Sequence, residues 1–192
     1  MTTESWLRYY IPLITQRAGD SPVFELGCGD GPDTSTLTGF GFKVTALDES
    51  TDQIARARKV CPIATYVCQD MRDPWPVSSR DKIGVVLASL SLHYFAWADT
   101  QLLVARIHSL LSKGGILLCR LNSVNDHNHG ARGYPEISHH FYQVGPVTKR
   151  FFDRSDIDTL FADQWRALSL KETTFDKVKK PKVAWECILE VV

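Results

Sequence analysis

The chain has 192 residues, of which 44% are hydrophobic and 23% charged, as expected for one folded domain and not for a disordered chain. Its 22 Lys and Arg residues balance 22 Asp and Glu residues, so the formal net charge is zero. Non-specific nucleic-acid binding relies on a basic surface that neutralises phosphates. The charge balance therefore argues against a general nucleic-acid binder.

The beginning of the chain lacks a basic segment followed by an apolar one, which is the pattern of a signal peptide. Apolar runs stay well short of the roughly 20 residues of a membrane helix, since residues 83–95 are interrupted by serines and His93. The five cysteines show no Cys-x-x-Cys spacing, which favours reduced thiols. These features predict a cytoplasmic protein without a membrane partner.

The first motif is a glycine-rich turn after a short apolar run. Residues 23–26 predict a buried strand, and Gly27, Gly29 and Gly31 alternate directly after it. Glycine lets a ligand approach the backbone closely, so the turn is a candidate binding loop. A nicotinamide dinucleotide fold would need a further glycine where Pro32 stands. A nicotinamide site and an ordinary glycine-rich turn are the alternatives.

Acidic residues follow two further predicted strands. Residues 43–47 end at Asp48, about twenty residues after the first glycine, where open α/β sites place a carboxylate for ribose hydroxyls. Residues 65–68 lead into Asp70 and Met71. Because the carboxyl ends of parallel strands meet at one edge of a sheet, we expect these acids and Glu25 to face one crevice.

The pattern from Glu25 to Gly31, acid-x-Gly-x-Gly-x-Gly, resembles motif I of the class I S-adenosylmethionine-dependent methyltransferases. The resemblance implies S-adenosylmethionine as cofactor and S-adenosylhomocysteine as product. It also implies that Glu25 helps to hold the cofactor's ammonium group, that Asp48 binds the ribose and that Asp70 reads the adenine. The chain looks closest to small stand-alone bacterial enzymes of the tellurite-resistance type. The implied cofactor site comprises Glu25, Gly27, Cys28, Gly29, Gly31, Asp48, Glu49, Asp70, Met71 and Ser89.

Strands and helices alternate along the chain. Further strands are expected at residues 82–88 and 115–119, and helices at 33–40, 51–60 and from Asp99 to Leu111. A helix capped by Ser155 and a hairpin of residues 165–175 and 183–191 end the chain. The order predicts an α/β fold, a Rossmann-like three-layer sandwich whose seven-stranded, mostly parallel sheet ends in a C-terminal antiparallel hairpin. Residues 1–192 are expected to form one domain.

Two segments are candidates for covering the crevice. The pattern in residues 1–18 predicts a helix that Pro12 kinks or shortens. In the resembling family such a helix often closes over the cofactor, and the alternative is a helix that only covers an edge of the sheet. Residues 122–150 are polar and follow a strand, so we expect a substrate lid, with a surface insertion as the alternative. The predicted acceptor-binding residues are Arg120, Asn122, Asn125, His127 and Tyr134, with Arg132, His139, His140 and Tyr142 as further wall residues.

Methyl transfer from a sulfonium needs alignment and exclusion of water, and needs a base only for some acceptors. The candidates for a catalytic role are His93, Tyr94 and Asp126, and the alternative for His93 is packing beneath the cofactor. The lid is rich in histidine but shows no known ligand spacing, so no metal site is predicted.

The predicted function is methyl transfer to a small-molecule acceptor by a monomer or homodimer. Alternatives are a non-catalytic S-adenosylmethionine-binding regulatory module, a nicotinamide oxidoreductase and a metal-dependent enzyme. The identity of the acceptor does not follow from the sequence.

Overall fold

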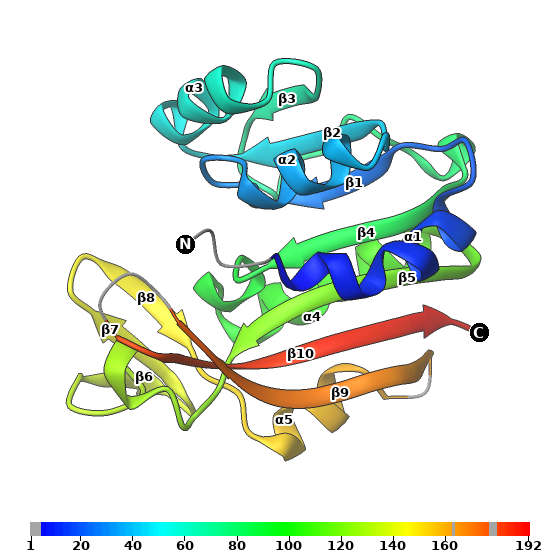
Figure 1. Cartoon of the computed structure of the whole chain (residues 1–192). Helices are drawn as coiled ribbons and strands as arrows, with labels where there is room; N and C mark the ends of the chain where they lie inside the picture. The colour runs from blue at the N-terminus through cyan, green and yellow to red at the C-terminus, as the bar shows by residue number, and fades with distance from the viewer. Residues whose placement is uncertain (1–4, 163, 177–179) are drawn as a thin grey trace.

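A computed structural model describes residues 5–162, 164–176 and 180–192. Its centre is a seven-stranded sheet in the order β3-β2-β1-β4-β5-β10-β9 (Figure 1). The first five strands pair in parallel, and β10 runs antiparallel to both β5 and β9. The predicted sheet with its C-terminal hairpin is confirmed. The strands are β1 (Val23–Leu26), β2 (Val44–Asp48), β3 (Thr65–Cys68), β4 (Ile83–Ser89), β5 (Leu111–Asn122), β9 (Trp165–Phe175) and β10 (Lys182–Val191).

Helices cover both faces of this sheet, which explains why β1 is buried throughout and β4 is buried over its first six residues. The 3₁₀ helix η1 (Trp6–Tyr10) and helices α1 (Ile11–Ala18), α2 (Pro32–Gly39) and α3 (Thr51–Val60) lie on one face (Figure 1). Helices α4 (Trp97–Leu110) and α5 (Arg154–Leu160) lie on the other. The three-layer arrangement is confirmed.

Helix starts follow the available caps. The hydroxyl of Ser50 accepts a hydrogen bond from the Gln53 amide at the start of α3, as predicted. Helix α5 begins after Asp153, not Ser155, because Asp153 and Asp156 each accept the other's amide N–H in a capping box. Helix α4 begins at Trp97 without a side-chain cap, so Asp99 lies in its first turn. The predicted caps at Ser155 and Asp99 are therefore wrong.

The segment from 122 to 150 is folded in its second half. Strands β6 (Glu136–Ser138), β7 (Phe141–Val144) and β8 (Val147–Arg150) form an antiparallel three-stranded sheet. It lies beyond the end of the large sheet at which β1, β4 and β5 finish (Figure 1). Strand β8 contacts the segment after β4 through Thr148, whose hydroxyl donates a hydrogen bond to the carbonyl of Tyr94 over 3.2 Å.

Short 3₁₀ helices complete the described chain: η2 (Ser79–Asp81), η3 (Leu92–Tyr94) and η4 (His127–His129). The kink predicted at Pro12 coincides with the change from η1 to α1, where proline occupies the second position of the α-helix and needs no amide hydrogen. Within the described residues, no helix combines the length and apolar character needed to cross a membrane.

Candidate functional site

A cavity of about 1180 Å³ opens at the carboxyl ends of the central strands. Its walls come from the segments after β1, β2, β3 and β4, from the end of β5, and from the β7–β8 turn. Open α/β sheets bind ligands at this edge, at the point where the order of the strands reverses. In this sheet that point lies between the neighbouring strands β1 and β4. Since single small-molecule sites occupy about 300 to 1,000 Å³, the cavity has room for two small molecules.

The glycine loop presents backbone to this cavity. Gly29 has a φ of +56°, and a Cβ built on it would meet no atom within 4 Å, so the space beside it is open. Gly27 has a φ of +74°, and a Cβ there would lie 2.4 Å from the Cβ of Ser91. Gly27 is therefore required for packing, whereas Gly29 leaves room for a ligand against the loop.

Glu25 is a buried acid in the cavity wall. Its Oε2 accepts a 2.5 Å hydrogen bond from the Thr34 hydroxyl. Burial, followed by the nearby carboxylate of Asp33, raises the pKa of Glu25 to about 8. A buried carboxyl group with carboxylates as neighbours fits a ligand that brings a positive charge, such as an ammonium group.

Two further acids line the cavity at the ends of β2 and β3. Asp48 accepts the backbone N–H groups of Gly29 and Ser50, each over 2.9 Å, and so ties the glycine loop to β2. Asp70 pairs with Arg72 over 2.6 Å, and this contact holds the pKa of Asp70 below its ordinary value. Both carboxylates are therefore held in fixed positions, where their oxygens can accept hydrogen bonds from a polar ligand.

Arg120 brings a positive charge to the cavity from the end of β5. Its Nε and Nη2 donate to the Ser89 hydroxyl over 3.0 and 2.8 Å. Its guanidinium carbon lies 4.7 Å from the Trp6 ring centroid and 4.8 Å from that of Phe175. Burial lowers the pKa of Arg120, but an arginine remains a cation at neutral pH. The cation is held between two aromatic rings within the site.

Most of the residues predicted for the cofactor meet at the cavity: Glu25, Gly27, Cys28, Gly29, Asp48, Glu49, Asp70, Met71 and Ser89 line it. Gly31 does not; it caps α2 with a φ of +87° and lies against Ala57. Among the proposed catalytic residues, Tyr94 lines the cavity with 44% of its surface exposed. His93 is buried outside the lining, with its ring centroid 4.4 Å from that of Tyr94.

Asp126 is fully buried away from the cavity. Its carboxylate accepts from the Lys182 ammonium over 2.7 Å and from the Val183 amide over 3.2 Å, and it lies 2.8 Å from Nδ1 of His129. These contacts fasten the segment after β5 to β10. The geometry thus gives Asp126 an anchoring position instead of one beside an acceptor.

The four acceptor-binding residues predicted after Arg120 also lie outside the cavity lining. Asn122 is buried and donates to the carbonyl of Arg150, and Asn125 donates to Glu172. His127 and Tyr134 are exposed elsewhere on the surface. The polar composition of this segment indicated a surface loop, but composition does not say which of its residues face a cavity.

Other lining residues were missed by sequence reasoning. Asp33, Val147, Thr148 and Phe175 come from α2, β8 and β9, which are far apart along the chain. The Gly145-Pro146 pair between two β-type runs is a turn signal that would have predicted the β7–β8 hairpin. Nothing local indicates that this turn reaches the cavity.

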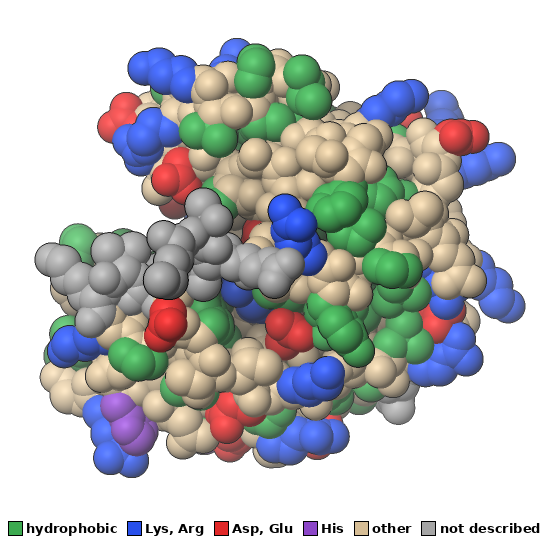
Figure 2. Space-filling model, in the orientation of Figure 1, with side chains coloured by type: hydrophobic (Ala, Val, Ile, Leu, Met, Phe, Trp, Pro, Cys, Tyr) green, Lys and Arg blue, Asp and Glu red, His purple; other side chains and the backbone are tan. Residues whose placement is uncertain are grey.

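Charge on the visible face agrees with the balance of the composition. Lys and Arg side chains are scattered among Asp and Glu over the face shown in Figure 2, without one large basic area. That face offers no extended surface for a phosphate backbone.

Residues 23–115 match a family model described as a methyltransferase domain. The match covers β1 to β4, with the glycine loop, and the start of β5. It ends before the small β6–β8 sheet, so the part of the chain after β5 lies outside the matched range.

Curated proteins that are similar to this chain include two methyltransferases from bacteria. An uncharacterised methyltransferase of Synechocystis sp. is 34% identical over 94 residues, which cover 49% of this chain and 43% of that protein. The trans-aconitate 2-methyltransferase of Delftia acidovorans is 29% identical over 113 residues, covering 58% of this chain and 40% of that protein. The alignments thus span less than half of each of these relatives.

Among solved structures, a methyltransferase from Methanosarcina mazei described as dependent on S-adenosylmethionine superposes with a TM-score of 0.79. The superposition covers 94% of this chain and 97% of that one at 13% sequence identity, so it shows a shared fold. Residues 23–115 therefore match a methyltransferase domain, and the chain as a whole shares the fold of a methyltransferase dependent on S-adenosylmethionine.

Proposed function

We propose that this protein transfers the methyl group of S-adenosylmethionine to a small organic acid whose carboxylate is bound by Arg120. The observation that carries the proposal is the position of Arg120, a partly buried cation in the cavity wall at the end of β5. Guanidinium groups recognise carboxylates through paired, charge-assisted hydrogen bonds.

The residues at the other end of the cavity fit the cofactor. Glu25 is suited to an ammonium group, Asp48 and Glu49 to ribose hydroxyls, and the open side of Gly29 to close approach of the ligand. Asp70 and Met71 lie at the end of β3, where the adenine is expected. When bound, the cofactor supplies an activated methyl group on a sulfonium.

The chain's own task is then alignment. A carboxylate is already an oxygen nucleophile, so its methylation needs no proton transfer, and no histidine occurs among the described residues that line the cavity. Arg120 would orient the acceptor, and the β7–β8 turn, with Val147 and Thr148, would cover it against water. This turn is the part of the 122–150 segment to which we assign the lid role.

The relatives support an acid as acceptor. The Delftia acidovorans relative is named for trans-aconitate, which is a small carboxylic acid. The competing function is a regulatory module that binds the cofactor without turnover. It predicts binding of S-adenosylhomocysteine but no methyl transfer to any acid.

The test begins with calorimetric titration of the protein with S-adenosylhomocysteine, using the reduced nicotinamide dinucleotide as a control. Methyl transfer from radiolabelled S-adenosylmethionine to a panel of mono-, di- and tricarboxylic acids follows. Binding of S-adenosylhomocysteine without transfer to any of these acids would favour the regulatory module.

Arg120→Gln separates the role of this residue from the cofactor site. We expect the KM for the acid to rise by at least about tenfold, since a charge-assisted contact is lost, while the Kd for S-adenosylhomocysteine stays within about twofold. Arg132→Gln, at an exposed position outside the cavity lining, is the matched control and should change neither value. A weaker Kd for S-adenosylhomocysteine at an unchanged KM would assign Arg120 to the cofactor and overturn the proposed acceptor class.

A further inference from the structure

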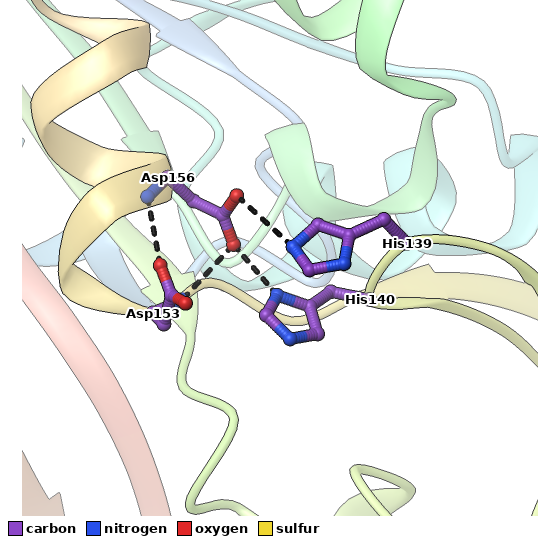
Figure 3. A group of neighbouring side chains, drawn as sticks. All are labelled: His139, His140, Asp153 and Asp156. Carbon is purple, nitrogen blue, oxygen red and sulfur yellow. Dashed lines mark hydrogen bonds and ion pairs between the residues drawn. The ribbon is translucent and has the colours of Figure 1, made fainter.

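A second polar cluster lies outside the cavity, where the turn between β6 and β7 meets the start of α5. His139 and His140 come from the turn, and Asp153 and Asp156 from the cap and first turn of the helix. Figure 3 shows the two imidazole rings beside the two carboxylates. None of the four residues lines the cavity described above.

The donor atoms of this cluster are close enough to share one ion. One donor atom from each residue lies within 4.8 Å of the other three. Nδ1 of His140 is 2.8 Å from Oδ2 of Asp156, and Nε2 of His139 is 3.9 Å from its Oδ1. Around a tetrahedral zinc ion, donor atoms lie about 3.3 Å apart. The His139 side chain is 73% exposed, so it can rotate to shorten the longer distances.

We propose that His139, His140, Asp153 and Asp156 form a zinc site that joins the β6–β7 turn to α5. Two imidazoles with two carboxylates are a donor set suited to zinc, whereas magnesium and calcium take oxygen ligands throughout.

The surroundings hold these side chains in place. The His139 carbonyl accepts from Arg150, the His140 amide donates to Glu136, and the His140 carbonyl accepts from the Phe151 amide. His140 has a φ of +55°, in the left-handed region that few non-glycine residues occupy. The turn is therefore fixed at three points with both imidazoles directed to one side (Figure 3).

The carboxylates are positioned as well. In the capping box, Asp153 uses Oδ1 for the Asp156 amide, and Asp156 uses Oδ2 for the Asp153 amide. One oxygen of each carboxyl group lies outside this pair of bonds and is available as a ligand. The cap thus presents two acids to the turn without giving up its backbone hydrogen bonds.

The sequence did not predict this set. Histidine density groups His127, His129, His139 and His140 along the chain, but His129 lies against Asp126 at another position. The carboxylates that join His139 and His140 are 13 to 17 residues further along the chain. Only the return of the chain through β7 and β8 brings them together.

The test is calorimetric titration of the whole protein with zinc chloride, in a Cys68→Ser background because the exposed Cys68 thiol would also bind zinc. We expect one zinc ion per chain with a dissociation constant in the micromolar range, and a higher melting temperature when zinc is added. His139→Ala and His140→Asn should each weaken binding by at least about tenfold and remove the rise in melting temperature.

Asparagine at position 140 tolerates the left-handed backbone, and the exposed His139 side chain can be removed with little effect on folding. His127→Ala, at an exposed histidine outside the cluster, is the matched control and should bind zinc like the parent. Zinc binding that survives both cluster variants, or absence of binding to the parent at micromolar concentrations, would overturn the proposal. The two histidines would then serve only to brace Asp156.

Discussion

The buried carboxyl group of Glu25 should lower the stability of the ligand-free protein at high pH. Its pKa is about 8 in the folded protein, against 4.5 for an exposed glutamate, because burial and the Asp33 carboxylate oppose ionisation. Between these two values the folded state holds a proton that the unfolded state has lost. The free energy of unfolding therefore falls as pH rises from about 4.5 to about 8. Above that range the contribution of Glu25 to the free energy of unfolding no longer changes with pH. One pKa unit is worth about 1.4 kcal/mol, so a shift from 4.5 to about 8 corresponds to a total loss of about 5 kcal/mol.

Glu25→Gln tests this reasoning. Glutamine keeps the size of the side chain and an oxygen for the Thr34 hydroxyl, but it carries no charge. We expect the variant to be more stable than the parent by about 2 to 4 kcal/mol at pH 8.5 and nearly equal to it at pH 4.5, as measured by urea unfolding. Glu49→Gln, at an exposed position on the cavity rim, should change stability by less than about 0.5 kcal/mol. If the free energy of unfolding depended on pH equally in the parent and in Glu25→Gln, the raised pKa of the buried Glu25 carboxyl group would be refuted.

The same variant separates stability from function. If Glu25 receives the cofactor's ammonium group, Glu25→Gln should weaken binding of S-adenosylhomocysteine by about 1.5 to 3 kcal/mol even as it stabilises the fold. Affinity of the parent should increase as pH approaches 8, because the carboxyl group must ionise to pair with the ammonium. This increase should be absent from the variant. Equal affinity in calorimetry for both proteins would remove Glu25 from the cofactor site.

Three further substitutions address the loop, the ribose position and the buried ion pair. Gly29→Val puts a branched side chain into the open space beside the loop and should abolish S-adenosylhomocysteine binding in calorimetry. The circular dichroism spectrum should stay close to that of the parent. Retained binding would place the cofactor elsewhere. Asp48→Ala removes the acceptor for the Gly29 and Ser50 amides and should weaken S-adenosylhomocysteine binding by about 1 to 3 kcal/mol. An unchanged Kd for S-adenosylhomocysteine would exclude Asp48 from the cofactor site. Asp126→Asn leaves the buried Lys182 ammonium without this carboxylate and should lower the free energy of unfolding in urea by about 3 kcal/mol. The rate of methyl transfer per folded molecule should change little. A large loss of methyl transfer at full stability would instead indicate a catalytic role.

The sequence by itself determined the central fold and predicted many of the residues that line the cavity. The apolar runs that became β1 and β4 are buried and contiguous, so their pattern needs no knowledge of the rest of the chain. The glycine loop and the acids after β2 and β3 follow directly from strands, and parallel pairing brings strand ends to one edge. Local patterns therefore predicted that Glu25, Asp48 and Asp70 would share a cavity.

Helix starts were less predictable because several polar residues compete for one cap. Asp153 caps α5 in place of Ser155, since only Asp153 has a partner, Asp156, that returns the hydrogen bond. The cap of α4 predicted at Asp99 is absent for a different reason. The helix starts at Trp97, whose ring lies 6.4 Å from that of Phe152, so tertiary packing outweighs a local capping preference.

The acceptor side of the cavity and the His139 cluster were decided by the tertiary structure. The sequence located a polar segment after β5, but not that its β7–β8 turn would reach the cavity while His127 and Tyr134 point to solvent. Likewise, no local spacing links His140 to Asp156, although they lie 2.8 Å apart. Periodicity and turn signals act over a few residues, whereas these contacts depend on how distant segments pack. Such packing is set by the burial of the whole core and by buried pairs such as Asp126 with Lys182.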